Sequence, residues 1–164
     1  MALTHLGGNP VHTNGDLPAV GSDAPDFNLL NNDLVRVSMA DYGDSTLVVS
    51  IFPSVDTGVC ATSVLTFNER AGALSGVKVL NVSADLPFAQ KRFCGAEGIE
   101  NVETLSTFGS EFLSDYGVQI EDGPFAGLAA RAVVVLKGGK VMHAELVPEI
   151  GQEPNYDAAL AAAK

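Results

Sequence analysis

The sequence predicts an α/β fold in which a central mixed β-sheet is flanked by helices. Three apolar runs rich in β-branched residues, at 47–52, 77–83 and 132–136, have the length and composition of buried strands. Apolar residues recur at helical spacing between the first two runs. A strand–helix–strand unit places its strands parallel, whereas a glycine turn after the third run favours an antiparallel pair, so the sheet is expected to be mixed.

Length and charge limit the possible classes of protein. The chain has 164 residues, which suits one domain with its own core. Nine basic residues against twenty acidic ones give a formal net charge of −11, so we expect neither nucleic acid nor an anionic membrane as a partner. No apolar run reaches the roughly 20 residues of a membrane helix, and the N-terminus lacks the pattern of a secretion signal. We therefore expect a cytoplasmic protein.

The N-terminal segment is predicted to form a small β-hairpin. Residues 1–18 contain short alternating segments around two turn signals, Gly7-Gly8-Asn9-Pro10 and Asn14-Gly15. We interpret this hairpin as an extension of the main fold. After it, residues 27–30 and 35–38 are predicted to form short strands.

The strand at 47–52 leads into a helix that begins near a cysteine. Pro53 ends the strand because proline has no N–H to donate to a neighbouring strand. Asp56 or Thr57 is the candidate N-cap of a helix whose apolar stripe starts at Cys60 and continues through Val64, Phe67 and Ala71. Unpaired backbone N–H groups and the helix dipole favour a thiolate at this position.

A second helix follows the strand at 77–83. Asp85 is predicted to cap this helix, with Pro87 in its first turn, where proline is tolerated. The helix carries Cys94, and Gly95 and Gly98 weaken its end. The next predicted elements are a strand at 102–105 and a short helix at 110–116 that ends at Gly117.

The last part of the chain is predicted to form a hairpin and a terminal helix. The turn at 137–140 returns the strand at 132–136 through a partner at 141–147, and an alanine-rich helix spans 155–163. The order of elements is that of a thioredoxin-like domain with an insertion in the middle. Because no repeat or linker is visible, residues 1–164 are predicted to form a single domain.

The two cysteines carry the main chemical signal. Cys60 and Cys94 are too few for a secreted disulfide scaffold, and they form neither Cys-x-x-Cys nor the ligand spacing of a zinc site, so we expect no metal. Cys60 could be a small apolar filler of its helix. The proline that ends the strand, Thr57 three residues earlier and the helix start all favour a nucleophile instead.

Residues 53–60, Pro-Ser-Val-Asp-Thr-Gly-Val-Cys, resemble the Pro-x-x-x-Thr-x-x-Cys signature of the peroxiredoxins. The Asp-Thr-Gly-Val-Cys variant, with the segments 83–90 and 92–94, is similar to bacterial thiol peroxidases, a group of atypical two-cysteine peroxiredoxins. The likeness runs from the Gly-Asn-Pro of the hairpin through Gly-Leu-Ala-Ala-Arg at 127–131 to the last helix. It implies a thioredoxin fold and an antioxidant peroxidase.

The resemblance also implies a role for each site residue. Cys60 matches the peroxidatic cysteine, which attacks a hydroperoxide and becomes a sulfenic acid while water or an alcohol leaves. Thr57 matches the hydroxyl that contacts thiolate and peroxide, and Pro53 the residue that shields the site from bulk water. Arg131 matches the arginine that holds the thiolate and the peroxide oxygens. Cys94 matches the resolving cysteine, which closes a disulfide with Cys60 inside one subunit.

Purely structural interpretations stand beside these roles. Arg131 opens an apolar strand, where its charged head could simply reach solvent. Thr57 could act only as a helix cap, and Pro53 only as a strand terminator. Cys94 could be a buried thiol or part of a static disulfide with Cys60, although lasting disulfides are rare in a reducing cytoplasm.

The resemblance implies hydroperoxides as substrates, thioredoxin as the electron donor, a homodimer, and no flavin, haem or metal cofactor. A disulfide needs its two Cα atoms within about 7 Å. Because Cys60 and Cys94 lie on separate predicted helices, we expect helix ends to unwind locally if the reduced cysteines are farther apart. Gly58, Gly95 and Gly98 lower the cost of that change.

Two other functions remain open from the sequence. A thiol–disulfide oxidoreductase acting on proteins is disfavoured because Ser63 occupies the position that would complete Cys-x-x-Cys. Ser63 could donate a hydrogen bond near Cys60, but we expect a packing or surface role. The other alternative is a binding or holdase module that reuses the fold without catalysis.

Overall fold

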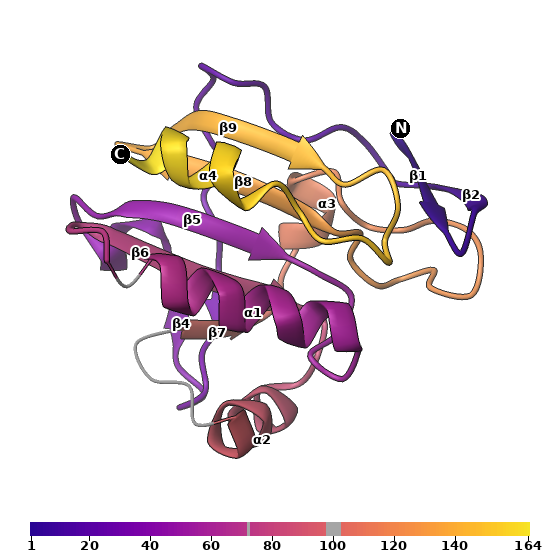
Figure 1. Ribbon diagram of the computed structural model, residues 1–164, viewed down its shortest axis with the longest axis horizontal. Coiled ribbons are helices and arrows are strands. Elements are labelled where there is room, and N and C mark those ends of the chain that lie inside the picture. The colour runs from indigo at the N-terminus through magenta and orange to yellow at the C-terminus, as the bar shows by residue number, and fades with distance from the viewer. Residues whose placement is uncertain (72, 98–102) are drawn as a thin grey trace.

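A computed structural model describes residues 1–71, 73–97 and 103–164. Within these residues the main sheet holds seven strands in the order β4-β3-β7-β6-β5-β8-β9. Figure 1 shows the helices against this sheet and a separate hairpin at its side. The predicted α/β fold with a mixed sheet and an N-terminal hairpin is confirmed.

The centre of the sheet consists of the apolar runs that the sequence predicts as strands. β5 (Thr46–Ile51) is buried along its whole length. It pairs in parallel with β6 (Val77–Ser83) and antiparallel with β8 (Ala132–Lys137). β6 also pairs in parallel with β7 (Glu103–Ser106). The carboxyl ends of β5, β6 and β7 therefore lie near one another, on the side of the sheet where the loop to α1 (Gly58–Ala71) begins.

The two edges of the sheet are antiparallel. The chain leaves β8 through Gly138 and Gly139, which both have positive φ, and returns as β9 (Lys140–Leu146). At the opposite edge, β3 (Leu29–Leu30) pairs with β4 (Arg36–Val37) and with β7. Both edge features lie at or within a few residues of their predicted positions.

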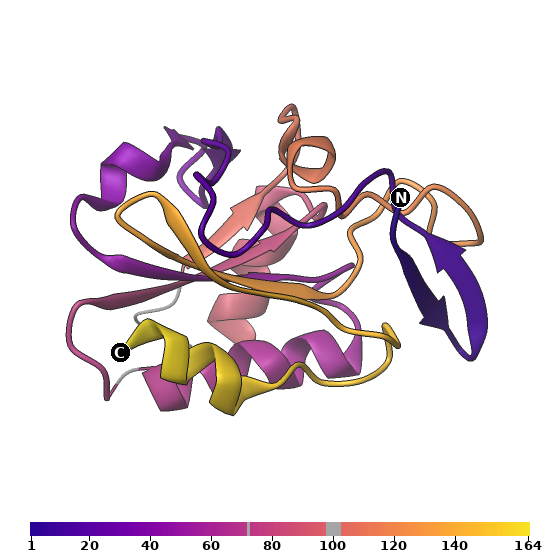
Figure 2. The same cartoon turned by 90° about the horizontal axis from the view of Figure 1, so that it is seen from above.

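Helices cover both faces of the sheet, as Figure 2 shows. α1 (Gly58–Ala71), α2 (Pro87–Glu97) and α4 (Tyr156–Ala163) lie on one face. The short α3 (Phe112–Asp115) and the 3-10 turn η1 (Met39–Tyr42) lie on the other. The sheet is therefore the middle layer of three.

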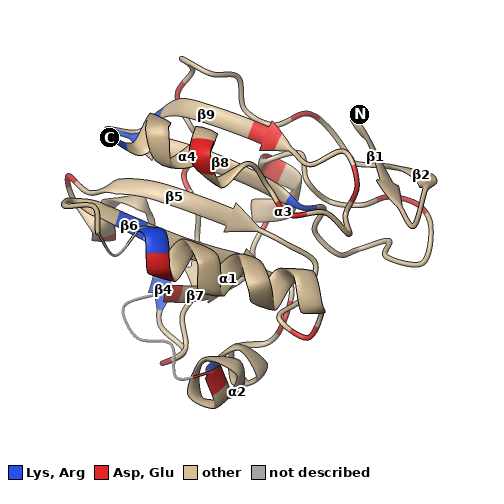
Figure 3. Ribbon diagram, in the orientation of Figure 1, with Lys and Arg blue, Asp and Glu red and all other residues tan. Residues whose placement is uncertain are grey.

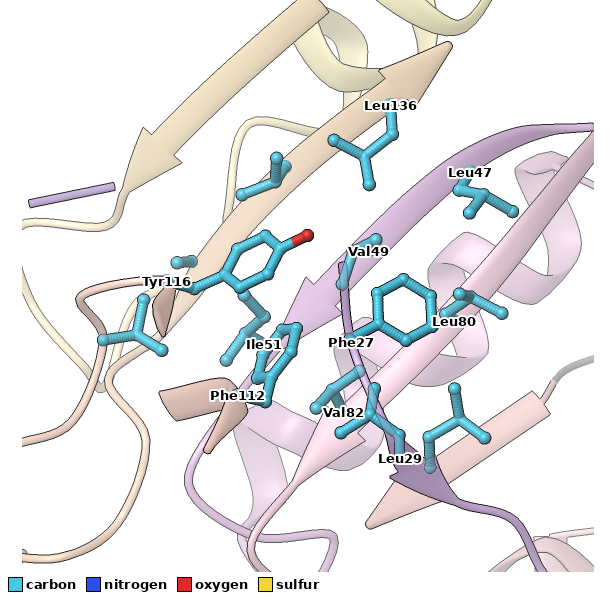
Figure 4. Packing of buried hydrophobic residues seen from close by; sticks show 14 of the residues in the cluster. Phe27, Leu29, Leu47, Val49, Ile51, Leu80, Val82, Phe112, Tyr116 and Leu136 are labelled. Carbon is cyan, nitrogen blue, oxygen red and sulfur yellow. The ribbon is translucent and has the colours of Figure 1, made fainter. Parts of the chain in front are cut away.

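Side chains alternate along β5 and build a separate apolar core on each face. Leu47, Val49 and Ile51 belong to the core beneath α3, whose members Figure 4 shows. Val48 belongs to the opposite core, between the sheet and helices α1 and α4. The larger core also contains Phe27, Leu29, Leu80, Val82, Phe112, Tyr116 and Leu136.

The N-terminal hairpin forms a two-stranded sheet of its own. β1 (Leu3–Leu6) pairs with β2 (Asn9–His12), and the chain turns at Gly7 and Gly8, whose φ angles are +61° and +83°. Glycine suits both positions because it adopts positive φ without steric cost. The predicted hairpin is confirmed.

Several predicted boundaries need correction. The helix predicted at 110–116 is shorter, because only Phe112–Asp115 are helical. The last helix begins at Tyr156, after Asn155, whose side chain accepts a 3.0 Å hydrogen bond from the Ala158 amide. The sequence reasoning missed η1. The predicted effects of Gly98 and the predicted start of a strand at Val102 lie outside the described residues.

Acidic residues outnumber basic ones in the chain. Figure 3 shows acidic residues on helices and loops with few basic ones among them, in line with the formal net charge of −11. None of the helices within 1–71, 73–97 and 103–164 combines the length and apolar character needed to cross a membrane.

Candidate active site

The loop between β5 and α1 is held by a carboxylate from the neighbouring strand. Asp85 follows β6, and its two oxygens accept hydrogen bonds from the Ser54 hydroxyl at 2.7 Å and the Val55 amide at 2.8 Å. The Ser83 hydroxyl also donates to Asp85, at 2.6 Å. The prediction that Asp85 caps the second helix is therefore wrong. Its carboxylate fixes the loop that precedes Cys60, because parallel strands bring both loops to the same edge.

Cys60 lies in the first turn of α1 with its side chain completely buried. It packs in an apolar cluster with Phe52, Val55, Val64 and Phe93. A guanidinium nitrogen of Arg131, Nη2, donates to its sulfur over 3.0 Å. A filler role in the core accounts for the burial but leaves the arginine unexplained, because a buried cation requires an acceptor of negative charge.

Arg131 is buried, with only 3% of its surface exposed. Its Nε donates to the carbonyl of Ile150 over 2.7 Å, and its Nη1 is buried without a partner among the described residues. The alternative in which Arg131 extends into solvent at the strand end is thus wrong. Its guanidinium lies inside the molecule, between Cys60 and the chain that follows β9, and both N–H groups of Nη1 are left over among the described residues.

Thr57 ends the loop at the start of α1. Its carbonyl accepts the first helical hydrogen bond, from the Ala61 amide at 3.0 Å, so its backbone occupies the N-cap position. Its hydroxyl donates to the Ser54 carbonyl at 3.2 Å, so it does not cap the helix through its side chain. Asp56, the other candidate cap, forms an exposed ion pair with Arg92 of α2 at 3.4 Å.

A small cavity of about 160 Å³ opens beside these residues. Thr57, Pro53 and Arg131 line it, and they bring the predicted polar and shielding groups to one place. The rest of the wall is mainly apolar and is formed by Leu6, Gly58, Val59, Phe125, Ile150 and Gly151. A molecule that enters the cavity meets Thr57 and Arg131, and Arg131 in turn contacts the sulfur of Cys60.

Cys94 lies on α2 and is half-buried. It packs against the same apolar cluster as Cys60, and its sulfur is 3.7 Å from the hydroxyl of Thr104. Both cysteines are free thiols, so a permanent disulfide between them is excluded in this structure. The structure places the two thiols against one cluster, on different helices.

Other side chains around the site are structural or were missed by sequence reasoning. Ser63 is buried and donates to the Cys60 carbonyl at 2.8 Å, so it does form a hydrogen bond beside Cys60, and the expected surface role is wrong. The contributions of Leu6, Phe125 and Ile150 have no local signal in the sequence, because they depend on how distant loops meet. Within the described part of the chain, no group of three or more His, Cys, Asp or Glu residues could hold a metal ion.

Known proteins of one family resemble this chain over nearly its whole length. Residues 19–160 match the redoxin family. A thiol peroxidase of Mycobacterium tuberculosis is 61% identical over 163 residues, which cover 99% of this chain and 98% of that protein. A thiol peroxidase of Corynebacterium glutamicum is 55% identical over 163 residues, with 99% of each protein covered. A peroxiredoxin-like protein from Aquifex aeolicus has a TM-score of 0.92 and 41% identity, covering 99% of this chain and 96% of that chain. The chain therefore belongs to the redoxin family, and within it to the thiol peroxidases.

Proposed function

We propose that this protein reduces hydrogen peroxide and organic hydroperoxides with Cys60 as the attacking thiolate. The observation that carries this proposal is the buried contact between Cys60 and Arg131 beside a small cavity. The guanidinium and the start of α1 both favour negative charge on the sulfur. Family membership and the near full-length identity to thiol peroxidases support the same chemistry.

In the first step the thiolate attacks the terminal oxygen of the hydroperoxide. The S–O bond forms as the O–O bond breaks, and the leaving oxygen takes a proton and departs as water or an alcohol. Cys60 is thereby oxidised to a sulfenic acid. The unpartnered Nη1 of Arg131 is available to a peroxide oxygen, where charge develops during the displacement. Thr57 and Pro53 bound the cavity in which the peroxide aligns with the sulfur.

In the second step the thiol of Cys94 attacks the sulfenic sulfur of Cys60. A disulfide forms and the hydroxyl leaves as water, which protects Cys60 from irreversible overoxidation. We propose that α2 unwinds near Cys94 to let the two sulfurs meet. Equal Cα separations of Cys60 and Cys94 in the reduced and oxidised proteins would contradict this movement.

The cycle requires a dithiol reductant from outside the chain. Thiol–disulfide exchange with thioredoxin would return both cysteines to thiols while thioredoxin becomes oxidised. We assign the protein to the cytoplasm, where such a reductant is maintained.

The protein is also proposed to form a homodimer beside the active site. Leu86, Phe88 and Phe108 are 46%, 67% and 58% exposed, and their segments meet where the Ser106 hydroxyl donates to the Asp85 carbonyl. Exposed apolar and aromatic side chains on linked segments favour association. Sedimentation analysis should find a dimer that Phe88→Ser weakens; a wild-type monomer at micromolar concentration would contradict the assignment.

Steady-state peroxide consumption tests the proposed reaction. With thioredoxin, thioredoxin reductase and cumene hydroperoxide, we expect sustained turnover by the wild-type protein and none by Cys60→Ser. Cys94→Ser should consume peroxide in a single turnover and then stop, because its sulfenic acid is not resolved as a disulfide. Undiminished turnover by Cys60→Ser would refute the proposal.

A further inference from the structure

We propose that the N-terminal hairpin belongs to the active site, where it sets the position of Arg131 through the segment 147–150. Thr4 and Glu149 are the positioning residues. This inference rests on the proposed role of Arg131 in the peroxide reaction. It gives the hairpin a catalytic purpose that its place outside the main sheet does not suggest.

Both ends of Arg131 are bound to the segment that follows β9. The Val147 amide donates to the backbone carbonyl of Arg131 at 2.9 Å. At the other end of the side chain, Nε donates to the Ile150 carbonyl at 2.7 Å. The position of the guanidinium relative to Cys60 therefore depends on the positions of Val147 and Ile150.

The hairpin binds the same two residues of that segment. The Thr4 hydroxyl donates to the Val147 carbonyl at 2.8 Å, and the Ile150 amide donates to the His5 carbonyl at 2.8 Å. Val147 and Ile150 thus each contact Arg131 through one backbone group and β1 through the other. Because Thr4 is fully buried, no solvent water can replace its hydroxyl without a rearrangement.

Glu149 attaches the segment to the turn of the hairpin. One oxygen of its carboxylate accepts hydrogen bonds from the amides of Gly7 at 2.7 Å and Gly8 at 3.3 Å. The positive φ angles of these glycines orient two successive amides toward one acceptor, which is a common way to hold an anion. Glu149 also forms a parallel β-bridge with His5. The turn and the segment are therefore joined at several points.

The hairpin also reaches the cavity directly. Leu6 lines its wall together with Ile150 and with Phe125 from the loop on the far side. That loop is bound to the hairpin as well, since the Glu121 amide donates to the His12 carbonyl at 2.8 Å. A shift of the hairpin would therefore disturb the guanidinium and the shape of the cavity together.

Matched substitutions test the positioning role. Thr4→Val removes the hydroxyl at nearly constant volume, whereas Thr4→Ser keeps it. Glu149→Ala removes the acceptor for the turn amides, whereas Glu149→Gln keeps one. We expect Thr4→Val and Glu149→Ala to slow the oxidation of Cys60 by hydrogen peroxide roughly tenfold, because small displacements of aligned groups reduce rates steeply. Thr4→Ser and Glu149→Gln should stay within about twofold of the wild-type rate.

A second reagent separates positioning from a general loosening of the fold. Alkylation of Cys60 by monobromobimane needs a thiolate but no guanidinium aligned with a peroxide, so Thr4→Val and Glu149→Ala should slow it much less than they slow the peroxide reaction. If both variants fold and react with peroxide at the wild-type rate while Arg131→Ala is slow, the hairpin proposal is overturned and the proposed function survives. Equal slowing of the peroxide reaction and of alkylation would also overturn the hairpin proposal. If Thr4→Val does not fold, the measurements on Glu149→Ala alone test the proposal. If Arg131→Ala reacts normally with peroxide, the role of Arg131 fails first.

Discussion

The contact between Cys60 and Arg131 joins two residues that are far apart in the sequence. Each is buried, and neither would be stable alone in its charged form, because desolvation of an unpaired ion costs several kcal/mol. Paired over 3.0 Å, the two groups stabilise each other in an apolar surrounding. Nη1 of the arginine has no partner among the described residues, and we propose that it binds the substrate.

At the residue scale, Arg131→Ala should lower the rate of Cys60 oxidation by hydrogen peroxide about a hundredfold or more, since it removes a fixed donor from developing charge. Stopped-flow mixing with Cys94→Ser as the background measures this rate. Arg70→Ala, which alters an exposed arginine at the far end of α1, serves as the control and should behave as the parent protein. A normal rate in Arg131→Ala would remove the arginine from the mechanism.

The site could be predicted from the sequence only where its residues follow one another. The spacing of Pro53, Thr57 and Cys60 is local, and the structure places Pro53 and Thr57 at the cavity wall and Cys60 in the first turn of α1. The position of Arg131 depends on the antiparallel pairing of β5 with β8, which brings Ile51 opposite Ala132. Sequence reasoning about an arginine at the end of an apolar strand gives no reason to expect burial, and only the family resemblance indicated the site.

At the element scale, α2 is attached to the sheet by polar contacts on the face that carries Cys94. Gln90 is fully buried and donates to the Ser83 hydroxyl at 3.0 Å and the Leu105 carbonyl at 2.9 Å. One helical turn later, Cys94 contacts Thr104, the neighbour of Leu105 on β7. Any unwinding that delivers Cys94 to Cys60 has to break these contacts.

Gln90→Leu should therefore make disulfide formation faster and overoxidation rarer. Loss of two buried hydrogen bonds weakens the docking of α2 by about 1–3 kcal/mol, which should raise the rate of resolution roughly tenfold if unwinding limits it. Mass spectrometry after graded hydrogen peroxide treatment measures the fraction of Cys60 in the sulfinic state. Lys91→Ala, on the exposed side of the same helix, is the control. An unchanged or larger sulfinic fraction in Gln90→Leu would show that α2 docking does not limit resolution.

The hairpin is a second element whose attachment can be tested, through the pH dependence of stability. Asp122 accepts hydrogen bonds from the His12 ring at 2.8 Å and its amide at 2.7 Å, and the ring contact lowers the pKa of Asp122 below its usual 3.8. A carboxylate whose pKa is lowered in the folded state stabilises the fold at pH values above its usual pKa. This contribution is lost as the pH falls through the lowered pKa. Asp122→Asn should thus melt below the wild-type temperature at neutral pH, by a small amount because the pair is exposed.

The difference in melting temperature between Asp122→Asn and wild type should shrink as the pH falls below 3.8, where the Asp122 carboxylate becomes protonated. Asp44→Asn changes an exposed carboxylate elsewhere and should show no such trend. A difference in melting temperature that stays constant at acidic pH would mean that the charge of the Asp122 carboxylate does not stabilise the fold through its contact with His12.

At the scale of the whole molecule, the sequence predicts the strands and helices that form the layers, but it does not predict how the loops approach one another. The strands that form the sheet centre were predictable because β-branched apolar runs are buried on both faces. The 3-10 turn at Met39–Tyr42 and the approach of residues 147–150 to the hairpin were not, because tertiary contacts determine them. The hairpin itself was found, yet its part in the cavity wall depends on that approach.

The two cores lie on opposite faces of one sheet and are formed by alternate residues of the same strands, so we propose that the chain unfolds as a single cooperative unit. Leu80 is fully buried in the larger core, and Leu80→Ala should lower the free energy of unfolding by about 2–5 kcal/mol, through lost burial and a cavity. Leu65→Ala, at a 39% exposed position of α1, should cost less than about 1 kcal/mol. Urea titrations followed by circular dichroism and by tyrosine fluorescence should give coincident transitions. Two separate transitions would contradict a single domain.

The most direct test of the central claim is the mass of Cys60 after one equivalent of hydrogen peroxide in the Cys94→Ser protein. With the second thiol absent, the sulfenic acid has no partner inside the chain, and dimedone can trap it. The account predicts one dimedone adduct on the peptide that contains Cys60, formed far more slowly when Arg131→Ala is added. An unmodified Cys60 peptide after complete consumption of the peroxide would contradict the account.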